Sequence, residues 1–391
     1  MLQSVWAKII EAKGEDRMNE KEWALSVAEK ILAKTKISVA RSKDKVPFVT
    51  INGIFNDCSD GISWWTNGFY AGQLWQLYHA YGVEQFKTVA EGIEKKLDGS
   101  LMNYQGMDHD SGFKWLLTSV ANYKMTGKAE SRNRALLAAA NLAGRFNLAG
   151  RYIRAWNEWN PGDESNAGWA IIDCMMNLPL LYWASEQAND PRFTQIAMAH
   201  ADTAMKAFVR ENGSVAHIVR FNPFTGEMID TLGGQGIEVG SSWTRGQAWA
   251  VYGFALSYRH TKKEEYLETA KKVGRYFANS VPESGFVPVD FCQDSFLDWE
   301  DDSAAAIAAC GLLEIEQYVE GEEKKFFHEA AMKLLTTLVE NRCNWSEDTD
   351  NIIEKCSSCY HDQNHNFSLI YADYYFTEAI LKLCDKELFM W

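Results

Sequence analysis

The sequence is poor in the features that stabilise small secreted proteins and membrane proteins. Its 391 residues include only 8 cysteines and 7 prolines, too few cysteines for a disulfide framework. No run of eighteen apolar residues occurs that could cross a membrane. The opening segment MLQSVWAKIIEAKGEDR also lacks the charged-then-apolar order of a secretory leader. We therefore expect a cytoplasmic protein that does not bind membranes.

Basic residues are also in the minority. The chain has 39 Lys and Arg against 53 Asp and Glu, a formal net charge of -14. A nucleic-acid-binding protein needs a basic face, so we expect no nucleic-acid partner. An acidic ligand would need a cation placed locally, which directs attention to single Arg and Lys residues.

What the sequence does have is a sixfold alternation of helical patterns. Each unit is a stretch of apolar and small residues followed by a charged, amphipathic stretch. A helix that is apolar all round lies inside a protein, and one with a single apolar stripe lies outside. The pattern predicts an all-α fold, an (α/α)6 barrel of six inner and six outer helices. The inner helices are expected to begin at Trp64, Asp110, Asp173, Thr244, Asp302 and Ala372.

The segment 21–34 (KEWALSVAEKILAK) would supply the twelfth helix by packing beside the last inner one. Both ends of the chain would then meet at one seam. No linker rich in Pro, Gly or Ser divides the chain, so residues 1–391 are expected to form one catalytic domain.

The N-termini of the inner helices should open at one end of the barrel, and several begin with Asp. Asp is a favourable N-cap residue, and for Asp302 and Asp373 a capping or structural role is the preferred interpretation. Asp110 lies beside His109 in MDHDSGF, a density of polar groups that is costly to bury without a purpose. Asp173 lies in WAIIDCMMNLPLLYW, where desolvation should raise its pKa toward that of a general acid. Asp110 and Asp173 are the candidate catalytic residues.

Aromatic residues recur near the loops at this expected open end. Sugar rings have apolar C–H faces rimmed by hydroxyls, so aromatic platforms with polar groups between them suit a carbohydrate. Arg245 lies among these aromatics and offers a planar, two-pronged donor to a carboxylate. Trp75, Trp115 and Trp183 lie within helical periodicity and are interpreted as core. The candidate platforms are Trp65, Trp156, Trp159, Trp243 and Trp249.

Five segments together resemble a known family, the unsaturated glucuronyl hydrolases of glycoside hydrolase family 88. The resemblance runs in order from about residue 60 to 380. Its motifs are WTNGF (65–69), DHDSGF (108–113), IIDCMMNLPLLYWA (171–184), SSWTRGQAWAVYGFAL (241–256) and DSAAAIAACGLLE (302–314).

The resemblance implies an enzyme that acts on the products of polysaccharide lyases. It would release the 4,5-unsaturated uronic acid from the non-reducing end of glycosaminoglycan-type oligosaccharides by hydrating the double bond. Asp173 would donate the proton, and Asp110 would bind ring hydroxyls and keep Asp173 protonated. No cofactor or metal is implied. The substrate-binding positions would be Trp65, His109, Trp156, His217, Gln235, Trp243, Arg245 and Trp249.

The chain departs from the family pattern at Gly234, where relatives can have His, at Asn67, where some have Asp, and over residues 356–368. The last segment is expected on the leaving-group side, and its His361 and His365 are more readily explained as solvated loop residues. Three alternatives stay open: an unsaturated rhamnogalacturonyl hydrolase acting on pectin fragments, an inverting glycosidase on the same barrel, and a sugar-binding protein without activity.

Overall fold

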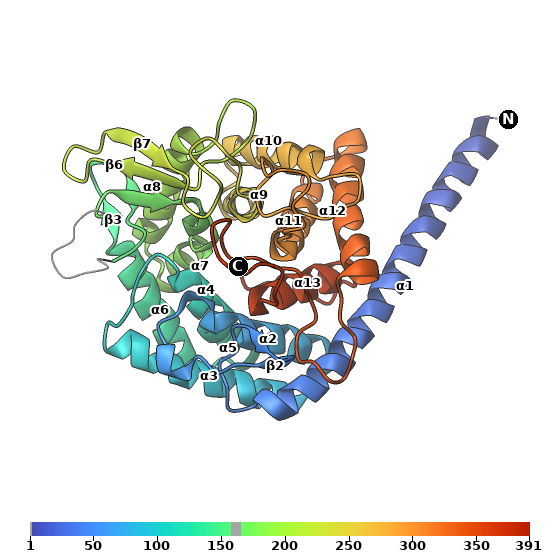
Figure 1. The fold of residues 1–391 in the computed structure, drawn as a ribbon, viewed down its shortest axis with the longest axis horizontal. Helices are drawn as coiled ribbons and strands as arrows, with labels where there is room; N and C mark the ends of the chain where they lie inside the picture. The colour runs from blue at the N-terminus through green and yellow to red at the C-terminus, as the bar shows by residue number, and fades with distance from the viewer. Residues whose placement is uncertain (1, 158–165) are drawn as a thin grey trace.

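The computed structural model describes residues 2–157 and 166–391, with the side chains of the first helix from Asn19 onward; the candidate Trp159 lies outside this part. The helices form a closed ring with an inner and an outer layer (Figure 1). The predicted (α/α)6 barrel is confirmed. The inner layer consists of α2 (Phe69–Tyr81), α4 (Ser111–Trp115) with α5 (Ala121–Thr126), α7 (Pro179–Ala188), α9 (Thr244–Thr261), α11 (Asp302–Glu316) and α13 (Ile370–Leu383).

Each inner helix except α13 is followed along the chain by an outer one, and α1, from the start of the chain, packs outside α13. The outer layer consists of α3 (Glu84–Met102), α6 (Ala129–Ala143), α8 (Pro191–Ala207), α10 (Glu264–Ser280), α12 (Gly321–Asn341) and α1 (Leu2–Ser42).

Burial separates the two layers as the hydrophobic patterns predict. In α11 every residue from Asp302 to Ile315 is buried, because α9, α12 and α13 surround this helix. In α10 the buried residues include Tyr266, Ala270, Val273 and Phe277, which recur at three- or four-residue steps on one face.

Two inner helices are interrupted near their starts. After α4 the chain makes a π-helical turn, Leu116–Val120, before α5. The helix expected at Asp173 begins instead as a 3-10 turn, Ile172–Met176, and α7 starts only at Pro179. Proline lacks the backbone N–H and clashes with the preceding turn, so it belongs at the start of an α-helix. Asp173 therefore lies in a short turn ahead of its helix.

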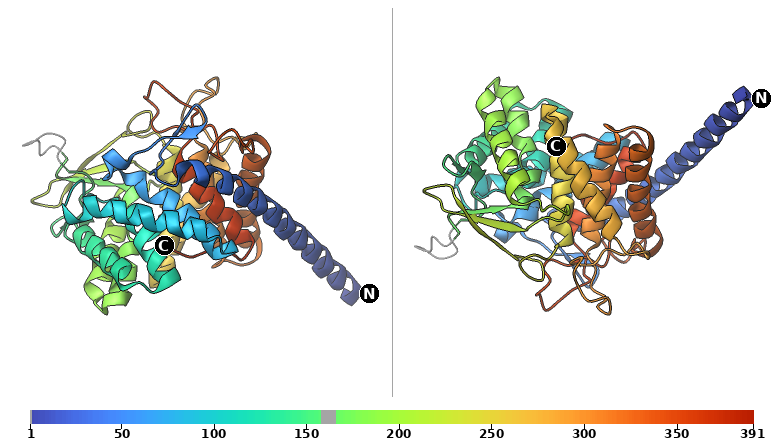
Figure 2. Two further views of the ribbon diagram at one scale, coloured as in Figure 1. Left: turned by 90° about the horizontal axis from the view of Figure 1, so that it is seen from below. Right: turned by 90° about the horizontal axis from the view of Figure 1, so that it is seen from above.

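The ring closes at a seam between the first and the last helix, as predicted, and Lys21 pairs there with Asp385 at 2.5 Å. The α1 helix does pack beside α13, as expected, but its N-terminal part projects away from the ring (Figures 1 and 2). The other end turns into the centre of the ring. Trp391 is buried there, stacks on Tyr375 at 5.7 Å between ring centroids, and donates its indole N–H to Glu378. The free energy gained by burying the large indole ring of Trp391 favours this position of the chain end over one at the surface.

Short strands occupy the loops between the helices. The strands β1 (Thr50–Ile51) and β2 (Ile54–Phe55) form one hairpin, and β3 (Phe146–Asn147) and β4 (Tyr152–Ile153) form another. An antiparallel sheet of order β5-β6-β7 joins Trp169–Ile171, Ile218–Phe221 and Met228–Leu232, with Ala170 opposite Val219 and Ile218 opposite Leu232. In the described residues, no helix combines the length and apolar character needed to span a bilayer.

Candidate active site

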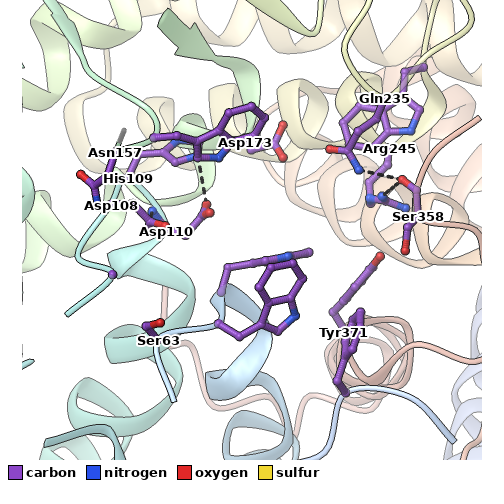
Figure 3. Close-up of a pocket in the computed structure, with 16 residues that line it drawn as sticks. Ser63, Asp108, His109, Asp110, Asn157, Asp173, Gln235, Arg245, Ser358 and Tyr371 are labelled. Carbon is purple, nitrogen blue, oxygen red and sulfur yellow. Dashed lines mark hydrogen bonds and ion pairs between the residues drawn. The ribbon is translucent and has the colours of Figure 1, made fainter. Parts of the chain in front are cut away.

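A pocket of about 590 Å³ opens at the ends of the inner helices (Figure 3). Segments far apart in the sequence contribute to it, including both candidate carboxylates. Eight of the ten predicted site residues line this pocket: Trp65, His109, Asp110, Trp156, Asp173, Gln235, Trp243 and Arg245. In the close-up, Asp108, His109 and Asn157 lie on one side, and Gln235, Arg245 and Ser358 lie on the other.

Asp110 is held by groups on three sides at the start of α4. Its backbone N–H donates to Asp108 Oδ1 at 3.0 Å, and its own Oδ1 accepts from Asn177 Nδ2 at 3.3 Å. His109 Nε2 lies 3.5 Å from the same oxygen. Burial is the largest cause that raises the pKa of Asp110 well above its usual value, and the charges of Asp108 and Asp173 raise it further.

Asn177 connects the two candidate acids. Besides Asp110, its amide N–H group donates to the backbone oxygen of Asp173 at 3.3 Å, and its Oδ1 accepts from Phe113 N at 2.9 Å. The approach requires a glycine: a Cβ at Gly112 would lie 2.5 Å from Asn177 Cα. The starts of two inner helices are thereby fixed against each other.

Asp173 follows strand β5 directly and reaches the pocket from the 3-10 turn. Its side chain is 17% exposed, and burial raises its pKa to about 7. The positive charge of Arg245 lowers this pKa, as do a backbone hydrogen bond and the indole N–H of Trp249, but burial prevails. A carboxylic acid with a pKa near 7 can donate a proton at neutral pH.

His217 lies just behind the lining of the pocket. Burial lowers its pKa to about 3, so the ring is neutral. Its Nδ1 accepts the backbone N–H of Gln235 at 2.9 Å, which places the proton on Nε2, and Nε2 lies 3.8 Å from Asp173 Oδ1. The turn that donates to His217 depends on Gly234, which has a φ of 60° and whose Cβ would lie 1.9 Å from His217 Nδ1. In this chain, a side chain at position 234 would therefore collide with His217.

Arg245 is the second residue of α9 and is almost fully buried. Its guanidinium pairs with Asp301 and donates to the backbone oxygens of Ser357 and Ser358. The ring of Trp243 lies 4.5 Å from the guanidinium carbon. Asp301 is the carboxylate paired with the Arg245 guanidinium. Arg245 therefore lines the pocket as half of an ion pair whose two charges cancel.

Of the predicted aromatic residues, some line the pocket and one is buried behind its lining. Trp65 lines the pocket and contacts Phe113 and Tyr371, with centroid distances of 5.4 and 4.9 Å. Trp249, predicted to face the substrate, is fully buried behind the lining and packs on Phe113 at 5.1 Å. The sequence places Trp249 one helical turn beyond Arg245 but does not give its depth. The prediction that Trp75, Trp115 and Trp183 belong to the core is confirmed by their burial.

The two other Asp residues near inner-helix starts stay out of the pocket, as the capping or structural interpretation predicts. Asp373 accepts the backbone N–H groups of Ile352 and Ile353, the latter at 2.7 Å. Asp302 lies 3.6 Å from Arg342. Asn67, the other departure from the family, is buried and donates to the backbone oxygen of Gly61.

Several lining residues were not singled out from the sequence. Trp64 and Asn157 adjoin predicted residues and could have been found by that proximity. Tyr371 adjoins the predicted helix start at Ala372, and Ser358 lies in the segment 356–368 expected on the leaving-group side. Phe48 comes from a distant segment and carries no local signal.

The segment 356–368 reaches the pocket through Ser358. The backbone oxygen of Ser358 accepts Gln235 Nε2 at 2.7 Å. His361 bonds to the backbone oxygen of Ile237, and His365 stacks on Trp299 at 4.0 Å. Neither histidine lines the pocket. In the described part of the chain, no three His, Cys, Asp or Glu side chains are grouped so that they could hold a metal ion.

Comparisons with known proteins agree with this arrangement. The profile of Glycosyl Hydrolase Family 88 matches residues 49–388. The chain belongs to glycosyl hydrolase family 88. Among family relatives, the unsaturated glucuronyl hydrolase of Bacillus sp. (strain GL1) is 36% identical over 351 residues, which is 87% of this chain and 91% of the relative.

Solved structures of unsaturated glucuronyl hydrolases also superpose closely on this chain. The chain superposes on unsaturated glucuronyl hydrolase of Streptococcus agalactiae with a TM-score of 0.87 and 29% identity, covering 95% of this chain and 94% of the other. A mutant of that enzyme, solved in complex with dGlcA-GalNAc6S, superposes with a TM-score of 0.82 at 27% identity over 95% and 94% of the two chains.

Proposed function

We propose that this family 88 chain releases the 4,5-unsaturated uronic acid from lyase-generated, glycosaminoglycan-type oligosaccharides, with Asp173 as the proton donor. The observation that carries the proposal is a carboxylic acid with a pKa of about 7 in a pocket walled by aromatic side chains. The relatives support the substrate class, since they are unsaturated glucuronyl hydrolases and unsaturated chondroitin disaccharide hydrolases. The whole chain, residues 1–391, is proposed to act as one catalytic domain.

The proposed reaction is hydration of a vinyl ether. Asp173 transfers its proton to C4 of the unsaturated ring, and positive charge develops at C5 and the ring oxygen. The carboxylate that remains on Asp173 stabilises this charge and assists water to add at C5. The resulting hemiketal opens to a ketone at C5, C1 becomes a hemiacetal, and the partner sugar leaves. The products are the free partner sugar and a 4-deoxy-5-keto uronic acid.

The neighbouring side chains have complementary proposed roles. Asp110 and His109 bind ring hydroxyls. Burial raises the pKa of both carboxyl groups, and the charges of Asp108 and Asp173 raise that of Asp110 further, so the pair retains a proton before reaction. Trp65, Trp156 and Trp243 contact the sugar faces, while Gln235 and Arg245 meet the uronate carboxylate. His217 and Trp249 act from behind the lining by orienting Asp173. Their N–H groups face the carboxylate that forms in the reaction.

The test uses the absorbance of the unsaturated uronate. Purified protein is mixed in parallel with unsaturated disaccharides of chondroitin, hyaluronan, heparin and rhamnogalacturonan. Loss of the absorbance with the first three substrates, abolished in Asp173→Asn, is the expected result. Turnover confined to the rhamnogalacturonan substrate would favour the pectin alternative. Cleavage of saturated substrates would indicate an inverting glycosidase, and no turnover at all would indicate a binding protein.

The proposed compartment remains the cytoplasm. All eight cysteines have free thiols, which is typical of proteins kept in a reducing environment.

A further inference from the structure

A second hollow lies next to the active-site pocket and has a different character. It measures about 510 Å³ and shares Asn157 with the pocket. Its lining comes from the end of α6, the β3–β4 hairpin and the turn between β6 and β7. Among its described lining residues are two arginines, Arg145 and Arg154, and no Asp or Glu. This is unusual in a chain with 53 acidic residues and a net charge of -14.

The two guanidinium groups bond only to neutral oxygens of the described residues. Arg145 donates to Arg154 O at 2.9 Å, Ala155 O at 2.9 Å, Met107 O at 2.9 Å and Asn157 Oδ1 at 2.8 Å. Arg154 donates to Asn166 Oδ1 at 2.8 Å. Neither arginine forms an ion pair with a carboxylate of the described residues.

The two arginines are close enough to affect each other. Burial is the main cause that lowers the pKa of Arg145; the charge of Asp108 raises this pKa, and the positive charge of Arg154 lowers it. An anion placed between the guanidiniums would relieve their repulsion and form charge-assisted hydrogen bonds. Aromatic side chains also border the hollow: Phe224 is 86% exposed and Tyr104 63% exposed. Exposed rings beside cationic groups suit an acidic sugar, which has both C–H faces and a charge.

We propose that the Arg145–Arg154 hollow is a binding subsite for an anionic substituent on the leaving chain of oligosaccharides longer than a disaccharide. The inference rests on the proposed function, because the unsaturated sugar must first occupy the pocket beside Asp173. Asn157 lies between the two spaces, and in the close-up it lies beside Asp108 and His109, away from Arg245 (Figure 3). A chain leaving past Asn157 would enter the hollow, where a carboxylate or a sulfate has the same chemistry.

The test compares leaving chains with and without charge. The charged substrate is the unsaturated hyaluronan tetrasaccharide, whose leaving chain carries a carboxylate. The neutral one is dGlcA-Glc-Rha-Glc, which has the same length. For each substrate, kcat/KM of Arg154→Gln is divided by that of the unchanged protein. We expect at least a threefold loss with the charged chain and less than twofold with the neutral one.

The matched control is Arg151→Gln, which removes an exposed charge from the same hairpin without touching the hollow. Arg151→Gln should change kcat/KM less than twofold for either substrate. Arg154→Lys should retain most of the kcat/KM for the substrate with the charged leaving chain. Raising NaCl from 20 to 200 mM should reduce the difference in kcat/KM for the charged substrate between the unchanged protein and Arg154→Gln, because salt screens interactions between exposed charges. Sulfated and unsulfated chondroitin tetrasaccharides then distinguish sulfate from carboxylate recognition.

Three results would overturn the subsite: equal losses with charged and neutral chains, no loss with either, or the same loss in Arg151→Gln. Melting temperatures of the variants separate misfolding from lost binding. If the unchanged protein turns over no unsaturated substrate, the proposed function itself fails. If the unchanged protein is active but Arg154→Gln has the same kcat/KM as the unchanged protein with both substrates, only the proposed subsite is contradicted.

Discussion

His217 Nε2 lies 3.8 Å from Asp173 Oδ1, and the backbone N–H of Gln235 holds the other ring nitrogen as an acceptor. A neutral ring with its proton on the side of the acid favours the ionised form of Asp173. Burial has the opposite effect and raises the pKa of Asp173 to about 7. The acid can therefore be protonated before reaction and stabilised as a carboxylate afterwards.

Replacing Asp173 with Asn should lower kcat by at least about a hundredfold while the melting temperature is retained, because general acid catalysis contributes roughly that factor or more. The matched control is Asp373→Asn, since burial also raises the pKa of Asp373 to about 7. Asp373 bonds to the backbone instead of lining the pocket, so its variant should melt at a lower temperature and keep its turnover. Full activity in Asp173→Asn would remove this residue from the mechanism.

The pH dependence of kcat should follow Asp173. Its pKa is raised in the folded protein, so the protonated, active form predominates below pH 7 and is lost above it. We expect kcat to fall about tenfold per pH unit well above 7. His217 and His109, with pKa values of about 3 and 4, are neutral throughout pH 5–9 and should add no inflection there. A flat profile from pH 5 to 9 would contradict the assignment of Asp173.

Gly234→Ala should reduce kcat more than its backbone strain explains. The added Cβ would collide with His217 Nδ1 and displace the ring from Asp173. A non-glycine residue at positive φ costs of order 1–3 kcal/mol in stability. Gly240→Ala provides the control, because Gly240 has a φ of 94° and open space around its Cβ position. Both variants should lose stability in thermal melting, but kcat should fall only in Gly234→Ala.

Replacing Arg245 with Gln should raise KM for the charged sugar and also destabilise the fold. The change leaves Asp301 buried without its partner, at a cost of about 3–5 kcal/mol. The double variant Arg245→Gln, Asp301→Asn should recover most of this stability without recovering KM. Steady-state kinetics and denaturant unfolding measure the two effects separately. An unchanged KM in the stable double variant would show that Arg245 does not bind the substrate.

The barrel could be predicted from the sequence because helix burial leaves a direct pattern. The residues of α11 are apolar or small nearly throughout, whereas those of α10 alternate with Lys and Glu, and the structure buries the two helices accordingly. Asp173 could also be recognised, since a lone carboxylate among apolar neighbours is unusual whatever the fold. These conclusions depend only on residues close together in the chain.

The final arrangement depended on contacts between distant segments. Only the tertiary structure brings Phe48 to a pocket that contains Asp110, and it places Trp249 and His217 behind the lining. It also decides that Trp391 is buried inside the ring. The sequence by itself determined the helices, their inner or outer position and the candidate acid, because periodicity and local polarity encode them. The depth of a side chain and the partners of a buried charge depend on packing across the ring, which local pattern does not record.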